Sequence, residues 1–155
     1  MTSGNPQTAE ELAELILQGR MFGSGTVLAG SDGIEQMAEV LAQIGEPDFV
    51  TVMVAASGPP QEATGVDGFR ELLSDWISPY ESFQLEVEDV LASEGKLVFL
   101  ARQVAMTRHD GVKVATESAS VWWVKSGRVS QVGFYLDRHA GMRAAGIDPD
   151  AASDA

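Results

Sequence analysis

The stretch FQLEVEDVLASEGKLVFLARQVAMTRHDGVKVATESASVWWVKSGRVSQVGFYL occupies residues 83–136 and decides the fold. Apolar and polar side chains alternate along most of it, and this period is typical of half-buried strands. Three short turn sequences interrupt the alternation: Glu94-Gly95, Asp110-Gly111 and Ser126-Gly127. Asp-Gly is favoured in two-residue hairpin turns, and we interpret the other two pairs in the same way. The stretch therefore predicts four consecutive antiparallel strands.

Each predicted turn fixes the register of the strands that it joins, because a two-residue loop pairs the residues on either side of it. Neighbouring side chains on a strand point to opposite sides, so the registers also divide the four strands into two faces. The expected pairs are Ser93 with Lys96, Val87 with Arg102, His109 with Val112, Arg102 with Ala119, Lys125 with Arg128, and Ala119 with Phe134.

One of the two faces is predicted to cover the core, because nearly all of its members are apolar. Its only charged members are Asp89, Arg102 and Glu117. The apolar members are Phe83, Leu85, Val87, Leu91, Val98, Leu100, Val104, Met106, Ala119, Val121, Trp123, Val132, Phe134 and Leu136.

The opposite face is predicted to be a subunit interface, with simple exposure to solvent as the alternative. It combines small, uncharged polar and aromatic side chains, whereas a solvated face of so acidic a chain would carry more Lys and Glu. A homodimer that forms through this face is therefore expected. The members are Phe99, Ala101, Gln103, Ala105, Thr107, Thr116, Ser118, Ser120, Trp122, Gln131, Gly133, Tyr135 and Asp137.

Helical patterns and turn residues complete an α+β domain over residues 31–147. We expect a helix from Ser31 or Asp32 to a C-cap at Gly45, a helix from Asp67 to the residue before Pro79, and a short last helix that ends at Gly146. A short strand is expected over residues 49–55, followed by a loop to Gly65. Residues 1–30 are predicted to be an N-terminal helical extension with a glycine-rich linker, and residues 148–155 a disordered acidic tail.

Composition limits the classes of partner. The chain has 155 residues, no cysteine and a formal net charge of -13, so nucleic acid and anionic membrane surfaces are unfavourable partners. Thiol-based metal sites are excluded, and the two histidines, His109 and His139, lie too far apart in sequence to suggest a spaced ligand pair. We expect a cytoplasmic protein without a metal, a cofactor or a membrane segment.

Four local patterns, taken in order, resemble those of a known family. They are GVDGFR at residues 65–70 opening a helix with Asp75-Trp76, EDV at 88–90 before a Glu-Gly turn, Trp123 before SGRV at 126–129, and YLDR at 135–138 ahead of AAGI at 144–147. Between Ser31 and Ile147 the chain thus resembles the SnoaL-like, ketosteroid-isomerase-like family, which has the nuclear-transport-factor fold. The resemblance implies a cone in which a curved antiparallel sheet wraps helices around an internal pocket, commonly in dimers.

The family's catalytic residues transfer poorly to this chain. Ketosteroid isomerases use a tyrosine in an early helix and an aspartate before a proline, but the N-terminal helices hold no tyrosine and residues 56–58 before Pro59 read Ala-Ser-Gly. Relatives similar to limonene epoxide hydrolase use Arg-x-Asp and a later aspartate. Here the corresponding strand reads Arg102-Gln103-Val104, so Val104 replaces the first aspartate. Phe134 stands at the position of the later aspartate. Only the arginine matches.

The sequence leaves two interpretations of Arg102, Asp89 and Glu117 open. A dry guanidinium needs an anionic partner, so the trio is either a structural ion pair or a catalytic group in which Arg102 orients a ligand oxygen and one carboxylate acts as general acid or base. For the pocket wall we expect six ligand-binding side chains, namely Trp76, Tyr80, Val104, Met106, Trp123 and Phe134.

Two functions follow from these interpretations. The first is a cofactor-independent isomerase, cyclase or epoxide hydrolase that acts on an apolar oxygenated molecule such as a steroid or polyketide. The second is a non-catalytic ligand-binding or dimeric accessory protein with the same fold.

Overall fold

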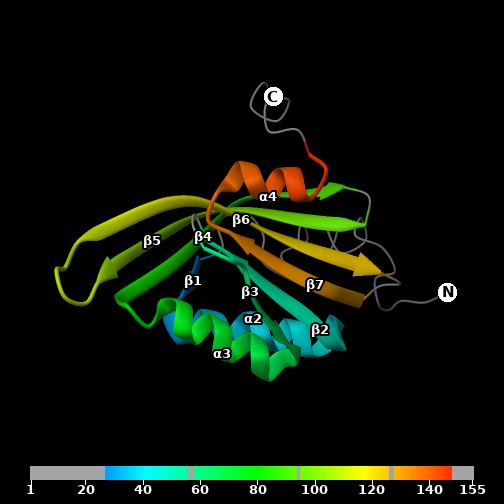
Figure 1. The fold of residues 1–155 in the computed structure, drawn as a ribbon, viewed down its shortest axis with the longest axis horizontal. Helices are drawn as coiled ribbons and strands as arrows, with labels where there is room; N and C mark the ends of the chain where they lie inside the picture. The colour runs from blue at the N-terminus through cyan, green and yellow to red at the C-terminus, as the bar shows by residue number, and fades with distance from the viewer. Residues whose placement is uncertain (1–26, 56–57, 94, 126–127, 148–155) are drawn as a thin grey trace.

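A strongly curved sheet wraps around two helices and carries a third helix on its other side (Figure 1). This computed structural model describes residues 27–55, 58–93, 95–125 and 128–147. Its helices are α2 (Gly30–Ile44), α3 (Gly65–Ile77) and α4 (Arg138–Ala144). Its strands are β1 (Val27–Ala29), β2 (Gly45–Val54), β3 (Gln61–Thr64), β4 (Tyr80–Ser93), β5 (Lys96–Thr107), β6 (Lys113–Lys125) and β7 (Arg128–Tyr135).

The strands form one sheet in the order β1-β4-β5-β6-β7-β2-β3. The predicted α+β class is confirmed, with one difference: β2 lies parallel to β7, so the sheet is mixed rather than entirely antiparallel. Two further strands lie where none was expected. Residues 27–29 were placed in a linker but pair with β4, and residues 61–64 were placed in a loop but pair with β2. The predicted N-terminal helix and acidic tail lie outside the described residues.

The helices α2 and α3 pack on the concave side of the sheet, because each has one apolar stripe. The C-cap predicted at Gly45 is confirmed, and the buried stripe of α2 includes Ile34, Met37, Ala38 and Leu41. α3 begins two residues earlier than predicted, and Asp67 does not cap it; its carboxylate instead accepts a hydrogen bond from Arg70 at 3.2 Å. On the solvent side Arg70 also binds Glu35 of α2 at 2.8 Å, which joins the two helices. Both partners are exposed, so this pair contributes little stability.

The predicted hairpins are correct near two of the three turns. Ser93 pairs with Lys96 and Lys125 pairs with Arg128, as expected. The β5–β6 turn is longer than predicted, because the amide of Thr107 donates to the carbonyl of Val112 at 3.0 Å and residues 108–111 form the loop. Within it Gly111 has a φ of +62°, which favours glycine. This two-residue shift places Arg102 opposite Glu117 instead of Ala119.

Two β-bulges overturn the predicted faces. In β4 the pairing skips Glu88, and in β7 it skips Ser130. An extra residue in one strand reverses the side of the sheet to which the residues beyond it point, relative to the partner strand. The predicted core-facing set was therefore wrong, because it combined residues from both sides of the sheet.

We call the side of the sheet that contacts α2 and α3 the inner face, and the opposite side the outer face. Much of the predicted subunit interface lies on the inner face and is buried there. It therefore cannot form a dimer surface, and the homodimer stays a prediction without an assigned interface. The inner-face residues of the four central strands include Leu85, Val87, Phe99, Ala101, Gln103, Ala105, Ser118, Ser120, Trp122, Val132 and Phe134.

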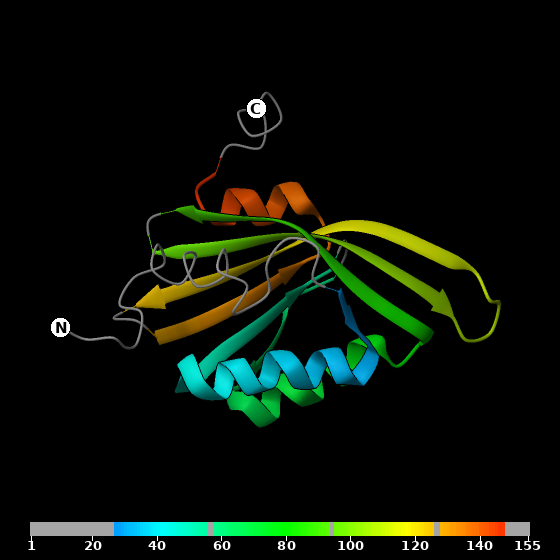
Figure 2. The ribbon, with the colours of Figure 1, turned by 180° about the vertical axis from the view of Figure 1, so that it is seen from behind.

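Part of the outer face is apolar too, and α4 covers this part (Figure 2). Val98, Ala119 and Val121 of the sheet pack there with Ala145 just beyond α4. A Cβ at Gly141 would lie 2.7 Å from the Cβ of Ala119, so glycine at this position allows the helix to approach β6 closely. A strand whose outer face is covered in this way shows the same alternation of apolar and polar residues as a strand whose apolar side faces the core.

Candidate functional site

A small cavity lies between the C-terminal part of α3 and the inner face. Its lining includes Trp76, Leu85, Ala101, Ser118, Ser120 and Phe134. The free volume at its centre is about 10 Å³, which is close to the smallest space that holds one water molecule. A larger guest therefore requires a side chain of the wall to move.

Aromatic rings form the wall of this cavity on the α3 side. The ring of Trp76 lies 5.2 Å from that of Phe83 in an edge-to-face arrangement and 6.2 Å from that of Phe134, measured between ring centres. Trp76 is only half buried. Its side chain therefore has more freedom to move than Phe134, which is 4% exposed.

An open groove of about 640 Å³ lies on the other side of this aromatic wall. Its lining includes Ile77, Tyr80 and Phe83, together with Arg108 from the β5–β6 turn. Phe83 thus lines the groove and contacts Trp76, which lines the cavity. The two spaces are thus each lined by one ring of this contacting pair.

Neutral polar groups lie on the inner face at and beside the cavity. Ser120 accepts a hydrogen bond from the indole Nε1 of Trp122 at 3.2 Å, and Ser118 has a long contact of 3.5 Å to the carbonyl of Ala101. The side-chain oxygen of Gln103 has no partner in the described part of the chain, although the residue is only 4% exposed. None of the described residues that are buried is ionisable.

The predicted catalytic trio does not lie in this site. Arg102, Asp89 and Glu117 are all exposed, and they lie on the outer face. The placement predicted for them was wrong because the bulge at Glu88 reverses β4 relative to β5, and the bulge at Ser130 reverses β7 relative to β6. No pocket-facing role remains for these three side chains in this arrangement.

The predicted ligand-binding residues are divided in the same way. Trp76 and Phe134 line the small cavity, and Tyr80 lines the open groove. Val104, Met106 and Trp123 lie on the outer face with Arg102, so their predicted place in the pocket wall was wrong for the same reason. Gln103, Ser118 and Ser120 were missed as site residues. Their signal was a run of small and neutral polar side chains, interpreted above as an interface.

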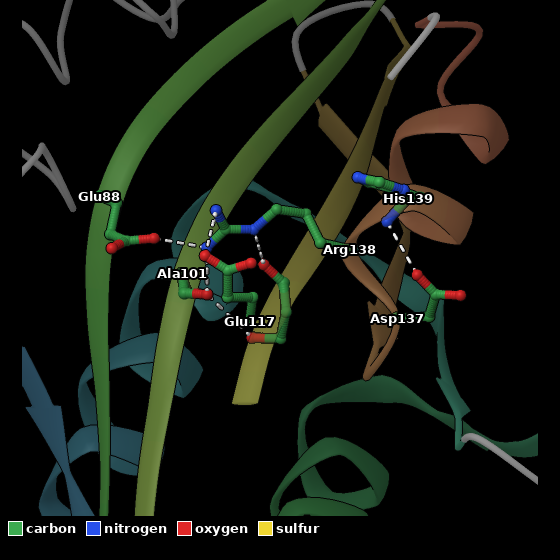
Figure 3. Close-up of polar contacts among 7 residues, drawn as sticks. Glu88, Ala101, Glu117, Asp137, Arg138 and His139 are labelled. Atoms are coloured by element: carbon green, nitrogen blue, oxygen red, sulfur yellow. Dashed lines mark hydrogen bonds and ion pairs between the residues drawn. The ribbon is translucent and has the colours of Figure 1, made fainter. Parts of the chain in front are cut away.

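Arg138, rather than Arg102, is the arginine held in a half-dry position. Its side chain is 18% exposed, and its guanidinium donates to the carbonyl of Ala101 at 2.7 Å and to that of Ser118 at 3.3 Å (Figure 3). It also binds Glu88 at 2.5 Å and lies 3.5 Å from Glu117. Arg138 therefore connects the start of α4 with β4, β5 and β6.

No group of His, Asp or Glu among the described residues is arranged to hold a metal ion. Of the helices that the structure describes, none is long and apolar enough to cross a bilayer.

Comparison with known families decides the assignment. The sequence model of the SnoaL-like domain matches residues 31–132. The chain belongs to the SnoaL-like family. No curated protein matches the sequence of this SnoaL-like protein.

Solved structures agree with this assignment at the level of the fold. One similar structure is a protein from Jannaschia sp. CCS1, described as a SnoaL-like polyketide cyclase, with a TM-score of 0.59 and 16% sequence identity. The match covers 96% of this chain and 100% of that one. A protein of ketosteroid isomerase-like fold from Catenulispora acidiphila, in complex with trimethylamine, has a TM-score of 0.52 and 11% identity over 73% and 85% of the two chains. TerC co-crystallised with polyporic acid has a TM-score of 0.52 and 14% identity over 70% and 84%.

One titratable group of this SnoaL-like protein lies at the edge of the site. Tyr135 borders the cavity and is half buried, but its ring packs on the outer face over Gly133, where an added Cβ would be 2.8 Å from the ring. Burial raises the pKa of the Tyr135 hydroxyl above its usual value.

The raised pKa of Tyr135 predicts a loss of stability in alkali. The unfolded chain releases the phenolic proton near pH 10, while the folded chain retains it to higher pH. The contribution of Tyr135 to the free energy of unfolding is thus complete below about pH 10. It is lost as the pH rises through the pKa of the folded protein. We expect Tyr135→Phe to reduce the fall in unfolding free energy between pH 9 and pH 11 in urea titrations, compared with the wild type. Parallel curves for the two proteins would contradict this.

Proposed function

We propose that this SnoaL-like protein binds a neutral, largely apolar small molecule between α3 and the inner face of the sheet. The observation that carries the proposal is the composition of the cavity wall, in which aromatic and aliphatic side chains surround a few uncharged polar groups. Pockets for small molecules generally combine an apolar lining with a small number of polar groups that fix the orientation of the ligand.

Binding without catalysis is favoured over the acid–base enzyme that the sequence also suggested. General acid–base catalysis needs a titratable group within hydrogen-bonding reach of the reacting atoms. On the inner face, the polar groups beside the cavity are the hydroxyls of Ser118 and Ser120 and the amide of Gln103, whereas the ring of Tyr135 packs on the outer face. These groups hold and orient a ligand, and they do not exchange protons with it near neutral pH.

The ligand enters by displacement of Trp76. The free volume of about 10 Å³ excludes a ring system while the indole stays in place, whereas the groove of about 640 Å³ on the other side of the Trp76–Phe83 pair is open. Movement of the Trp76 ring toward the groove joins the two spaces. The complexes of TerC with polyporic acid and of the Catenulispora protein with trimethylamine support small-molecule binding by this fold.

The proposal is tested by thermal unfolding with a panel of neutral polycyclic compounds, with tryptophan fluorescence as a second readout. A compound present at 100 times its dissociation constant stabilises the protein by about 2.7 kcal/mol, which gives a measurable rise in melting temperature. Ala101→Leu fills the floor of the cavity, so we expect it to weaken binding at least about tenfold.

Arg102→Leu is the matched control, because it introduces the same side chain at the next residue but on the outer face. It is expected to leave the affinity unchanged. Loss of binding in Arg102→Leu, with Ala101→Leu unaffected, would restore the outer-face trio as the site and overturn the proposal.

A further inference from the structure

The side-chain oxygen of Gln103 is a buried acceptor without a partner. The residue is 4% exposed, and its Oε1 finds no donor in the described part of the chain. Buried polar atoms are satisfied in the great majority of cases, because an unpaired one carries the full cost of its lost hydration. An orphaned acceptor on the inner face of a domain that binds small molecules therefore points to a donor brought by the ligand.

The register places Gln103 beside the cavity. It lies two residues from Ala101 on the same face of β5, and Leu85 pairs with it from β4. Both neighbours line the cavity, as does Ser118, which is the cross-strand partner of Ala101 and a diagonal neighbour of Gln103. A ligand enlarging the cavity along β5 meets the amide of Gln103 next.

The chemistry around Gln103 selects an uncharged donor. Its cross-strand neighbours on the inner face are Leu85 and Thr116, and its neighbours along β5 are Ala101 and Ala105. An ammonium or a carboxylate on the ligand would be buried among these side chains without a counter-charge, which is strongly unfavourable. A hydroxyl supplies the missing donor at no such cost.

We propose that Gln103 is the specificity-determining residue of the cavity and that it accepts a hydrogen bond from a hydroxyl group of a neutral, ring-containing ligand. This inference rests on the proposed function, since it requires that the cavity binds a ligand. It adds the class of ligand, which is a phenol or an alcohol. Neither the corresponding ether nor a charged molecule belongs to this class.

The test compares two probes that share a ring system, 2-naphthol and 2-methoxynaphthalene, of which only the first has a donor. Affinity is measured by fluorescence titration for the wild type, Gln103→Leu and Gln84→Leu. Gln84 is the matched control, because it carries the same side chain but is exposed at the neighbouring strand β4. Side-chain amide signals in ¹⁵N spectra provide a readout of Gln103 itself.

We expect the wild type and Gln84→Leu to bind 2-naphthol roughly tenfold more tightly than 2-methoxynaphthalene, as the pairing of a buried acceptor predicts. Gln103→Leu is expected to remove this preference by weakening 2-naphthol alone, and the Gln103 amide signal is expected to shift only with 2-naphthol. The melting temperature of Gln103→Leu should not fall, because the substitution removes an unpaired buried oxygen. Weaker binding of 2-naphthol by this variant therefore cannot be explained by unfolding.

The two possible failures are distinct. If the wild type binds both probes equally, or Gln103→Leu keeps the preference, the role of Gln103 is overturned while the binding function stands. This is the result expected if a buried water serves the amide oxygen. If neither probe binds the wild type or a Trp76→Ala variant with an enlarged cavity, the binding function itself is overturned, and the role of Gln103 with it.

Discussion

Replacement of Arg138 by Met is expected to lower the free energy of unfolding by about 2–4 kcal/mol. The variant keeps an unbranched side chain of comparable length but removes the donors that reach the carbonyls of Ala101 and Ser118. Each such hydrogen bond from a charged donor contributes about 1.5–3 kcal/mol, and the losses are not fully additive. Because Glu88 is 38% exposed, its ion pair with Arg138 adds a smaller amount.

Arg102→Met is the control for this prediction. This variant makes the same Arg-to-Met change on the outer face, but Arg102 is exposed. We therefore expect its free energy of unfolding to change by no more than about 0.5 kcal/mol. Urea unfolding of both variants distinguishes the two arginines. Equal losses would mean that the carbonyl contacts of Arg138 contribute nothing beyond surface charge. Since Ala101 and Ser118 also line the cavity, Arg138→Met is further expected to weaken ligand binding by loosening its floor.

Phe69→Ala is expected to cost about 3–5 kcal/mol of unfolding free energy, the range for a fully buried aromatic residue. Phe69 is 0% exposed and stands between two other rings, 6.4 Å from that of Phe49 and 6.1 Å from that of Phe134 between centres. Truncation leaves a cavity that neither neighbouring ring can fill without leaving its own contacts. Since domains of this size are stable by about 5–15 kcal/mol in total, the variant loses a large share of its stability.

Two further variants bracket this prediction. Phe69→Leu retains most of the buried volume and is expected to cost clearly less than Phe69→Ala. Glu71→Ala changes an exposed position on the same helix and should stay within about 0.5 kcal/mol of the wild type. Thermal and urea unfolding supply the measurements. A loss in Phe69→Ala no larger than in Glu71→Ala would show that the aromatic core lies elsewhere.

Local signals in the sequence were sufficient for most of the elements, though not for the short strands β1 and β3, and for the class of the fold. The stripes of α2 and α3, the C-cap at Gly45 and the paired residues next to two turns depend on residues a few positions apart. The chain order of these elements, with the patterns at residues 65–70 and 135–138, was sufficient for the family. The match of the SnoaL-like domain to residues 31–132 agrees with it.

The candidate site could not be predicted in the same way, because it depends on which side of the sheet each strand presents to the helices. A bulge is one unpaired residue, and neither Glu88 nor Ser130 differs in type from residues in a regular ladder. The apolar outer face under α4 removed the other signal, since Val98 and Val121 are as buried there as Phe99 is on the inner face. Arg102 was consequently placed inside, and Gln103 outside.

By itself the sequence determined the helices, the strands other than β1 and β3, their order and the class of the domain, because periodicity and caps are set by neighbouring residues. Only the tertiary structure decided which face encloses the cavity, which arginine is partly buried, and that Gln103 rather than Arg102 lies beside the candidate site. The physical reason is that side chains alternate with a period of two, so one unpaired residue in a strand exchanges the inside and the outside of the sheet.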